Sequence, residues 1–348
     1  MPLFRRKPAA PPDPRPAIAD FWTWWAGARN DVVAALDGAD PQGLSGALTD
    51  AVGRIHPELD WALTPGVDVA RYALVVSAGG RHDLRSVAHR WWLAAPPADT
   101  EFEYHPVRRR DPAAVEGVLD VDDYELPLVE FVAGTRYDEQ RGRFDLAVHH
   151  PLFPLLDKES RTRAAFLALG AALGEDDVER WVGAVDVTAD QPVDAVPLAS
   201  LAPLVDGLRQ GGDAWVTFTG ATRRGRPVVG VVRRPFSRVD RPLADTHVAI
   251  SLPYEPGDQG MPTVPDFAKQ VDAWERRALD ALGGDGEHAV LVGHETGLGR
   301  CLVHLYVDGL EVDPAAVDPM LPEWSMGPAR RHTAAPDPAW REIGHLLA

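Results

Sequence analysis

The sequence predicts an α+β protein of two domains, and three observations support this prediction. The chain has 348 residues, a length typical of two domains, with 45% apolar and 25% charged residues, as in globular proteins. A stretch rich in proline and glycine at 191–212 separates two differently patterned halves. Beyond that stretch, the order β-β-β-α-β-β indicates one helix covering an antiparallel sheet.

The first domain is expected over 17–190, after a disordered proline-rich tail at 1–16. Six of those sixteen residues are proline, which removes backbone donors and disfavours helix. Helices are predicted over 16–37 and 43–55, because apolar residues recur there at helical spacing.

A strand-turn-helix unit follows. Short apolar runs predict strands at 60–63 and 71–77, the second of which enters Gly79-Gly80 before a helix over 82–94. Residues 101–107 are expected to form an edge strand.

The rest of the first domain is predicted as a hairpin followed by helices. The hairpin spans 124–149, with a turn at Arg141-Gly142. A helix over 158–173 ends at Gly174 and precedes a short helix and strand over 175–187. The stretch 191–212 is expected to be a linker carrying one short helix near 202–208.

The second domain, 213–348, contains the clearest helix of the chain. It covers 266–282, with one apolar stripe, Asp266 as the expected N-cap and Gly283-Gly284 as the stop. The strands predicted around it cover 214–219, 227–234, 246–252, 288–296 and 301–308, and the last two pair as a hairpin.

Charge and composition exclude several classes of function. With 35 basic and 52 acidic residues the net charge is −17, which opposes attraction of the whole molecule to nucleic acid. No apolar stretch is long enough to span a bilayer, and prolines replace the apolar core of a secretion signal. The single cysteine, Cys301, cannot form an internal disulfide, so a cytoplasmic location is expected.

The turn at Ser77, Gly79, Gly80 and Arg81 is a candidate anion or ligand site. A helix N-terminus offers unpaired N–H groups to an anion, and His82 or Asp83 would supply a titratable group for a hydrolase. The competing interpretation is a simple tight turn, since the segment lacks the glycine pattern of a nucleophile elbow or a phosphate loop.

No metal site, cofactor or catalytic set is expected. His149 and His150 point to opposite sides of a strand, and His82 and His89 have no third ligand at a recognisable spacing. His294-Glu295 and His304 flank the last hairpin without a zinc signature. Ordinary strand-end or surface histidines explain all three groups.

Arginines gather in the second domain, over 223–241. The members of this arginine strip are Arg223, Arg224, Arg226, Arg233, Arg234, Arg238 and Arg241, accompanied by one acid, Asp240. Residues 111–130 carry seven acids and no base. Three interpretations stay open: the two blocks meet, one docks a charged partner, or both are solvated. Trp24 and Trp92 lie off their helices' apolar faces and are candidate interface anchors.

The second domain resembles an uncharacterised bacterial family, domain of unknown function 695, which is related in fold to the ribonuclease E inhibitor, regulator B. The resemblance is carried by AWVTFTGATRRGRPVVGVV, the DQGMP stretch at 258–262, VLVGHETGLGR with HLYVD, and PDPAWREIGHLL. The first domain is similar to domains of other uncharacterised bacterial proteins through VVSAGG, WWLAAP and AALGEDDVERWVG. The resemblance implies a ferredoxin-like second domain and a function through protein contact. It carries no catalytic residues.

The sequence therefore favours a non-enzymatic, cytoplasmic protein-interaction or regulatory module that binds an unidentified protein. One alternative is a hydrolase or small-ligand-binding protein that uses the Ser77–Gly80 turn. A second alternative is an RNA-binding protein or ribonuclease regulator that uses the arginine strip.

Overall fold

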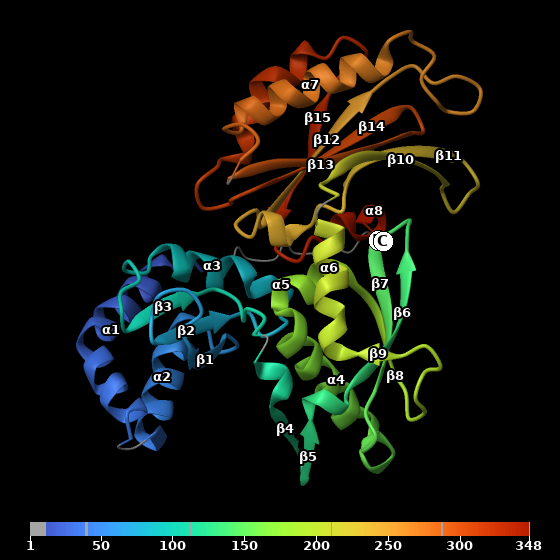
Figure 1. Cartoon of the computed structure of the whole chain (residues 1–348). Coiled ribbons are helices and arrows are strands. Elements are labelled where there is room, and N and C mark those ends of the chain that lie inside the picture. Colours follow the sequence, from blue (N-terminus) through green and yellow to red (C-terminus); the bar gives the residue numbers. More distant parts are fainter. Residues whose placement is uncertain (1–11, 39–40, 112, 210, 287, 348) are drawn as a thin grey trace, which may run out of the picture.

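The chain folds into three lobes, each with its own hydrophobic core (Figure 1). The computed structural model describes residues 12–38, 41–111, 113–209, 211–286 and 288–347. Helices and a β-sheet occur in every lobe, which confirms the α+β class. Among the helices of the described residues, none is both long and apolar enough to cross a membrane.

The N-terminal lobe, residues 15–105, places helices against a three-stranded sheet. Strand β2 lies between β1, which is antiparallel to it, and β3, which is parallel. Trp25 and Trp91 are fully buried in its core. Its elements are α1 (Arg15–Leu36), α2 (Pro41–Ile55), β1 (Asp60–Pro65), β2 (Tyr72–Ser77), η1 (His82–Leu84), α3 (Arg85–Leu93) and β3 (Phe102–His105).

The proline-rich tail predicted at 1–16 lies mostly outside the described residues. Its end differs from the prediction, because Arg15 and Pro16 already belong to α1. Proline fits the first turn of a helix, where the N–H group that it lacks would have no helical partner.

The middle lobe, residues 114–209, contains a four-stranded sheet of order β8-β7-β6-β9 and a separate β4–β5 hairpin. Helix α4 buries a row of alanines, Ala164, Ala165, Ala168 and Ala172, in the core of this lobe. The elements are β4 (Val118–Val121), β5 (Tyr124–Pro127), β6 (Val132–Asp138), β7 (Arg143–His149), α4 (Lys158–Leu173), α5 (Glu175–Trp181), β8 (Val182–Val187), β9 (Val196–Pro197) and α6 (Leu201–Arg209).

The single hairpin predicted over 124–149 is divided in the structure. Strand β5 pairs with β4 and ends at Pro127, and a 3₁₀ turn at Leu128–Glu130 breaks the chain before β6. Only β6 and β7 form the expected hairpin. Proline lacks a backbone donor, so Pro127 is a natural end for a strand.

The expected domain division also differs from the arrangement of cores. The stretch 17–190 contains two hydrophobic cores instead of one. The segment between them, 106–113, has no buried residue among those described, and its Arg108 and Arg110 form ion pairs with Asp60 and Asp206. The linker expected at 191–212 is largely part of the middle lobe. Strand β9 pairs with β6, and Leu201 and Val205 of α6 are buried in that core.

The C-terminal lobe is built on a six-stranded sheet of order β10-β11-β13-β14-β12-β15, in which all neighbours are antiparallel. Helix α7 and the 3₁₀ segment η7 share one core, and α8 contributes to another. The predicted β-β-β-α-β-β order is present, and β15 is an addition. The elements are β10 (Ala214–Ala221), β11 (Pro227–Arg234), η6 (Arg238–Asp240), β12 (Thr246–Pro253), α7 (Phe267–Ala281), β13 (Ala289–Gly297), β14 (Arg300–Val307), η7 (Pro314–Glu323), β15 (Arg330–Pro336) and α8 (Gly344–Leu347).

Helix α7 ends as predicted but begins differently. Gly283 and Gly284 have φ of 103° and 88°, the left-handed backbone expected for a glycine stop. Asp266 was the expected N-cap, yet it has φ of 60° and makes no side-chain cap bond. A cap residue normally has extended backbone, so the left-handed conformation prevents the capping geometry. The Asp266 carboxylate forms an ion pair with Lys269.

Candidate functional site

The Ser77–Arg81 turn is closed by the middle lobe. Ser77 is buried and its Oγ donates to Oε1 of Glu175 in α5 at 2.9 Å, while the N–H of Gly79 donates to that Oγ at 3.2 Å. Gly79 and Gly80 adopt positive φ, as a tight turn requires. Arg81 points outward and pairs with Glu58.

Glu175 is the titratable group beside this turn. Burial raises its pKa, and the hydrogen bond from Ser77 and the charge of Arg108 oppose that rise. His82 binds Glu179, and Asp83 is exposed. The turn does not line either of the two cavities described below. The Ser77 hydroxyl therefore joins the N-terminal lobe to the middle lobe.

Glu179 of α5 lies where the three lobes meet. Its carboxylate pairs with Arg85 (2.7 Å) and His82 (3.4 Å) of the N-terminal lobe and with Arg238 (2.6 Å) of the C-terminal lobe. Burial alone would raise the pKa of Glu179. The hydrogen bond from His82 and the charges of Arg85 and Arg238 outweigh that effect and lower the pKa to about 2.

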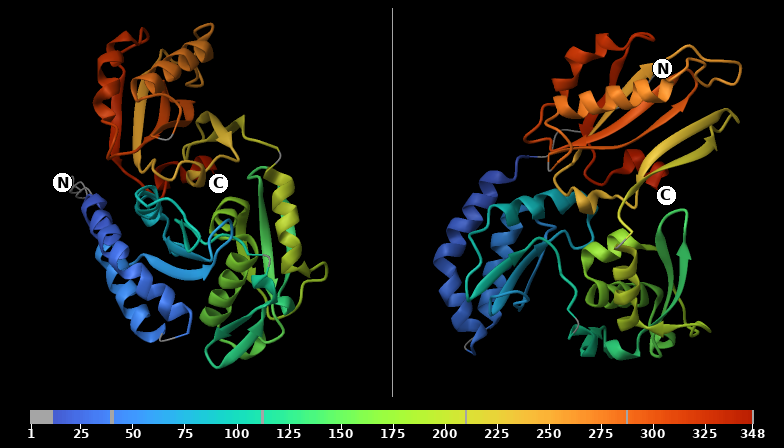
Figure 2. Two further views of the ribbon diagram at one scale, coloured as in Figure 1. Left: turned by 60° about the vertical axis from the view of Figure 1, so that its left-hand side comes forward. Right: turned by 45° about the horizontal axis from the view of Figure 1, so that its top comes forward.

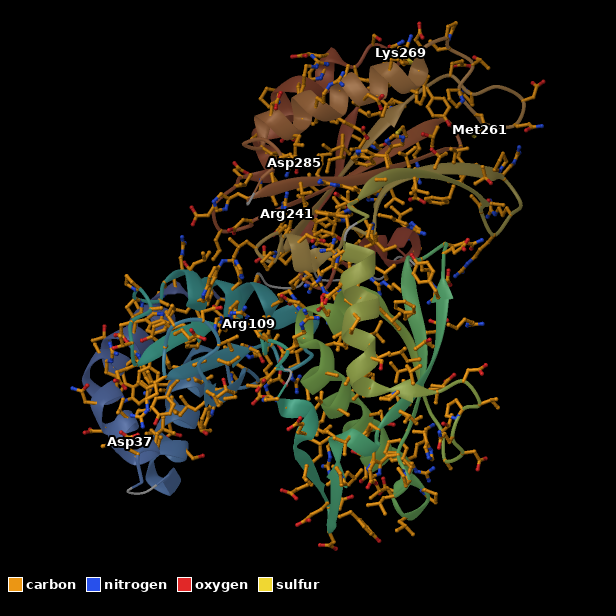
Figure 3. All side chains as sticks on the ribbon, in the orientation of Figure 1. Asp37, Arg109, Arg241, Met261, Lys269 and Asp285 are labelled. Carbon is orange, nitrogen blue, oxygen red and sulfur yellow. The ribbon has the colours of Figure 1, made fainter. Side chains whose placement is uncertain are left out.

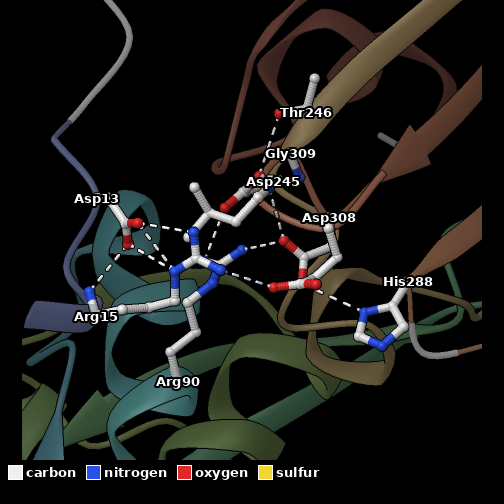
Figure 4. A network of polar contacts seen from close by, with 10 residues as sticks. Asp13, Arg15, Arg90, Asp245, Thr246, His288, Asp308 and Gly309 are labelled. Atoms are coloured by element: carbon white, nitrogen blue, oxygen red, sulfur yellow. Dashed lines mark hydrogen bonds and ion pairs between the residues drawn. The ribbon is translucent and has the colours of Figure 1, made fainter. Parts of the chain in front are cut away.

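Further ion pairs join the lobes. Arg90 of α3 reaches Asp245 at 2.9 Å and also binds Asp308, and both acids belong to the C-terminal lobe (Figure 4). Arg180 of α5 binds Asp240 of η6. Two further views show the C-terminal lobe resting on the other two (Figure 2). The contacts between lobes therefore rest heavily on arginine-carboxylate pairs.

The arginine strip is divided between two environments. Arg233 pairs with Asp213 and Asp285, Arg234 donates to the carbonyls of Gln140 and Leu346, and Arg238 binds Glu179. These three arginines stabilise the fold and the contacts between lobes. Arg241 donates to the carbonyl of Asp240.

The other three arginines, Arg223, Arg224 and Arg226, surround the turn of the β10–β11 hairpin. None of them forms an ion pair with another described residue. The acidic block at 111–130 lies far away, around the β4–β5 hairpin at the opposite end of the molecule (Figure 1). Within the described ranges, no ion pair links that block to the strip.

Strand β10 is one edge of the six-stranded sheet. Seven of its eight residues are exposed. Trp215 is 51% exposed and Val216 40%, although both belong to a regular strand. Phe218 is the one partly buried residue, and its ring lies over Gly230 of β11. The hairpin therefore presents a backbone edge together with apolar side chains.

A cavity of about 560 Å³ opens on the N-terminal lobe, and its walls combine aliphatic, aromatic and charged residues. Trp92 and Tyr104 are among its aromatic residues, and Asp68, Glu103 and His105 among its polar ones. Arg109, labelled in Figure 3, also lines it and lies where the chain passes to the middle lobe, beside Gly174. A second cavity, of about 440 Å³, is lined by His89, Asp240 and Arg241.

Sequence reasoning missed the acids and the histidine of the larger cavity. Asp68 is 35 residues from Glu103 and the group matches no spacing motif. The only available signal was the alternation of Glu103 and His105, which places both on one face of a strand.

The histidines considered in the sequence have separate partners. His294 binds Glu275 of α7, whereas His304 lies 3.4 Å from Glu295 and 3.0 Å from His247. His149 contacts the carbonyl of Thr188, and Nδ1 of His150 accepts from Leu152 N–H. Burial lowers the pKa of His89 to about 4, with Arg85 and Arg90 acting in the same direction.

Comparisons of the chain with protein-family models, curated proteins and solved structures give no match.

Proposed function

We propose that the protein is a non-enzymatic, cytoplasmic binding module that recognises an acidic, extended segment of a partner protein through the β10–β11 hairpin. The observation that carries this proposal is an edge strand of eight residues that is almost wholly exposed and carries Trp215 and Val216. Exposed edge strands pair readily with an added strand, because one row of their N–H and C=O groups has no partner in the sheet.

The outer edge of β10 suits a peptide ligand. Among the described residues no strand pairs with this edge, so its backbone N–H and C=O groups are open to an added strand. An added strand would gain backbone hydrogen bonds, while Trp215 would supply the buried aromatic contact typical of interface hot spots. Soluble proteins usually shorten, charge or cover such an edge.

Charge selects an acidic partner. Residues 214–234 contain five arginines and no acid, in a chain whose net charge is −17. Arg233 and Arg234 have partners within the protein, which leaves Arg223, Arg224 and Arg226 at the tip. Arginine binds carboxylates with two parallel hydrogen bonds, so the tip suits a segment rich in Asp and Glu.

The same arginines would attract RNA, but the hairpin fits a peptide better. Single-stranded RNA is bound on rows of aromatic rings beside a basic groove. Trp215 is the only exposed aromatic residue of the hairpin, since Phe218 packs against Gly230. A free strand edge adds hydrogen-bonding groups that a peptide backbone matches.

A ferredoxin-like fold for residues 246–336 belongs to the same proposal. The element order β12-α7-β13-β14-η7-β15 and the strand order β15-β12-β14-β13 support it, with η7 in place of the second helix. The β10–β11 hairpin then extends the β13 edge of that unit. The resemblance to the domain of unknown function 695 family, whose relative in fold, regulator B, acts by protein contact, also favours this proposal.

The test is an affinity capture from lysate of the source organism, at low and high salt, with bound proteins and RNA both identified. The hairpin variants are Trp215→Ala and the combined Arg223→Glu, Arg224→Glu, Arg226→Glu. Arg330→Glu, an exposed arginine on the opposite edge strand β15, is the matched control.

We expect the wild type and the control to retain one protein that both hairpin variants lose. With that protein purified, the charge reversals should raise Kd at least about tenfold, as for several arginine-carboxylate contacts. Equal retention by the hairpin variants, or retention of salt-labile RNA alone, would contradict the proposal.

A further inference from the structure

Three side chains of metal-ligand type converge on the wall of the larger cavity. Asp68 lies in the loop after β1, and Glu103 and His105 lie on β3. One ligand atom from each residue lies within 4.8 Å of the other two. Glu103 and His105 are two residues apart on a strand, so the backbone directs them to the same side.

The Glu103 carboxylate is held in a fixed position. Its oxygens accept N–H groups of Val67 (2.6 Å), Asp68 (3.1 Å) and Val69 (3.3 Å), so the loop from β1 is fastened to β3. These three N–H groups fix the direction of the carboxylate, so it is oriented in advance, as hydrogen-bonded metal ligands are.

The spacing of Glu103 and His105 suits one shared ion. Nε2 of His105 lies 3.1 Å from Oε1 of Glu103. Two atoms about 2.0–2.2 Å from one Zn²⁺ at a tetrahedral angle lie about 3.3 Å apart, so both atoms can bind the same ion with little movement. The hydrogen bond between them would be replaced by two metal bonds.

Asp68 and the cavity complete the arrangement. The Oδ2 atom of Asp68 pairs with Arg109 at 2.6 Å, which leaves Oδ1 for an ion. The carboxylates of Asp68 and Glu103 outweigh the guanidinium of Arg109, so these three side chains together favour a cation. The cavity of about 560 Å³ leaves room for water or a small ligand at the remaining coordination positions.

From this geometry we infer that Asp68, Glu103 and His105 form a binding site for one divalent transition-metal ion of the zinc class. The imidazole determines the class, because nitrogen ligands suit Zn²⁺ and Co²⁺, whereas Mg²⁺ and Ca²⁺ prefer oxygen ligands alone. The site is independent of the β10–β11 hairpin, which belongs to another lobe.

The test is a titration of the full-length protein, stripped with a chelator, with Zn²⁺, Co²⁺ and Mg²⁺. The variants are His105→Gln, which keeps a hydrogen-bond donor but removes the imidazole, and Asp68→Asn, at an exposed position that leaves the Glu103 anchor intact. The control is His332→Gln, an exposed histidine on β15 in the C-terminal lobe. Urea unfolding of each variant verifies that it is folded.

We expect the wild type and the His332 variant to bind one Zn²⁺ per chain in preference to Mg²⁺. Each cavity variant should raise the Kd for Zn²⁺ at least about tenfold, since even outer-shell changes cost that much. Bound Co²⁺ should give visible absorption bands of a four- or five-coordinate site, and His105→Gln should remove them. Zn²⁺ binding that is absent, or unchanged in both cavity variants, would overturn the inference and leave Glu103 as a loop anchor only.

Discussion

Glu179 is the residue whose side chain contacts all three lobes. Arg85 and Glu179 are largely buried, with side chains 9% and 12% exposed. Removing one partner of a buried ion pair is costly because the other charge is left without compensation. Neutralising Glu179 would leave both Arg85 and Arg238 with less negative charge around them.

We expect Glu179→Gln to destabilise the protein by about 3 kcal/mol at neutral pH, the cost typical of a broken buried pair. Because the folded-state pKa, about 2, lies below the ordinary value of 4.5, the carboxylate stabilises the fold above pH 4.5. That contribution is lost as the pH falls from 4.5 toward 2. Urea unfolding should therefore show that the difference in the free energy of unfolding between wild type and variant becomes smaller as the pH falls through this range. The control is Glu125→Gln, an exposed carboxylate on β5. A difference in the free energy of unfolding that stays constant with pH would contradict the role given to the ionised Glu179 carboxylate.

At the residue scale, sequence reasoning identified residue types but not their partners. The arginines at 233, 234 and 238 were recognised as a group, but nothing local indicated that Arg238 binds Glu179, 59 residues away. The sequence left the Ser77 turn open between a ligand site and a simple tight turn. The positive φ of Gly79 and Gly80 fits a tight turn, and its closure by Glu175 depends on how two lobes dock. Such contacts depend on tertiary packing, which local patterns do not encode.

At the element scale the sequence was far more informative. The predicted helix over 158–173 matches α4, and the strand over 227–234 matches β11. An apolar run marks each of them, with Gly174 after the helix and Pro227 at the start of the strand. The elements that were missed are short or irregular. Strand β9 has two residues, and β4 lies inside an acidic stretch. Strand β15, RRHTAAP, has Thr333 as its one β-branched residue.

The β10–β11 hairpin depends on a glycine that faces an aromatic ring. Gly230 is paired with Phe218 across the two strands, and a Cβ atom built at Gly230 would overlap the Phe218 ring. Phe218 in turn packs beside the core that contains Val232. The absence of a side chain at 230 therefore lets the hairpin lie close to the rest of the lobe.

We expect Gly230→Ala to displace Phe218 and cost about 1–3 kcal/mol, as overpacking does. Hydrogen exchange should become faster in residues 214–221 and 227–234, and stay unchanged in β12 and β14. The matched control in the same hairpin is Gly220→Ala, since a Cβ there meets no atom within 4 Å. Equal hydrogen-exchange rates in the two variants would show that the packing of the Phe218 ring on Gly230 does not stabilise the hairpin.

At the scale of the whole molecule, no hydrophobic core is shared between two lobes, and the lobes are joined through charged groups. Contacts of this kind resemble transient interfaces, in which domains move unless the shared surface is large and apolar. Burial protects the pairs around Arg85 and Arg90 from screening, since both side chains are 9% exposed. A substitution that removes one of these ion pairs should therefore separate the lobes more effectively than a moderate increase in salt concentration.

Arg90 is the position at which this can be measured. It binds Asp245 and Asp308, and the Asp308 side chain is only 2% exposed, so Arg90→Ala leaves a buried carboxylate with a weaker set of partners. We expect the C-terminal lobe to move away from α3, which raises the radius of gyration measured by small-angle X-ray scattering. The circular dichroism spectrum should stay unchanged, because each hydrophobic core is intact. The control is Arg54→Ala, an exposed arginine of α2 that makes no ion pair with the described residues. If the radius of gyration of the Arg90 variant equals that of the control, the remaining pairs at Glu179, Asp240 and Glu311 are sufficient to hold the lobes together. The arrangement is then more rigid than its charged contacts imply.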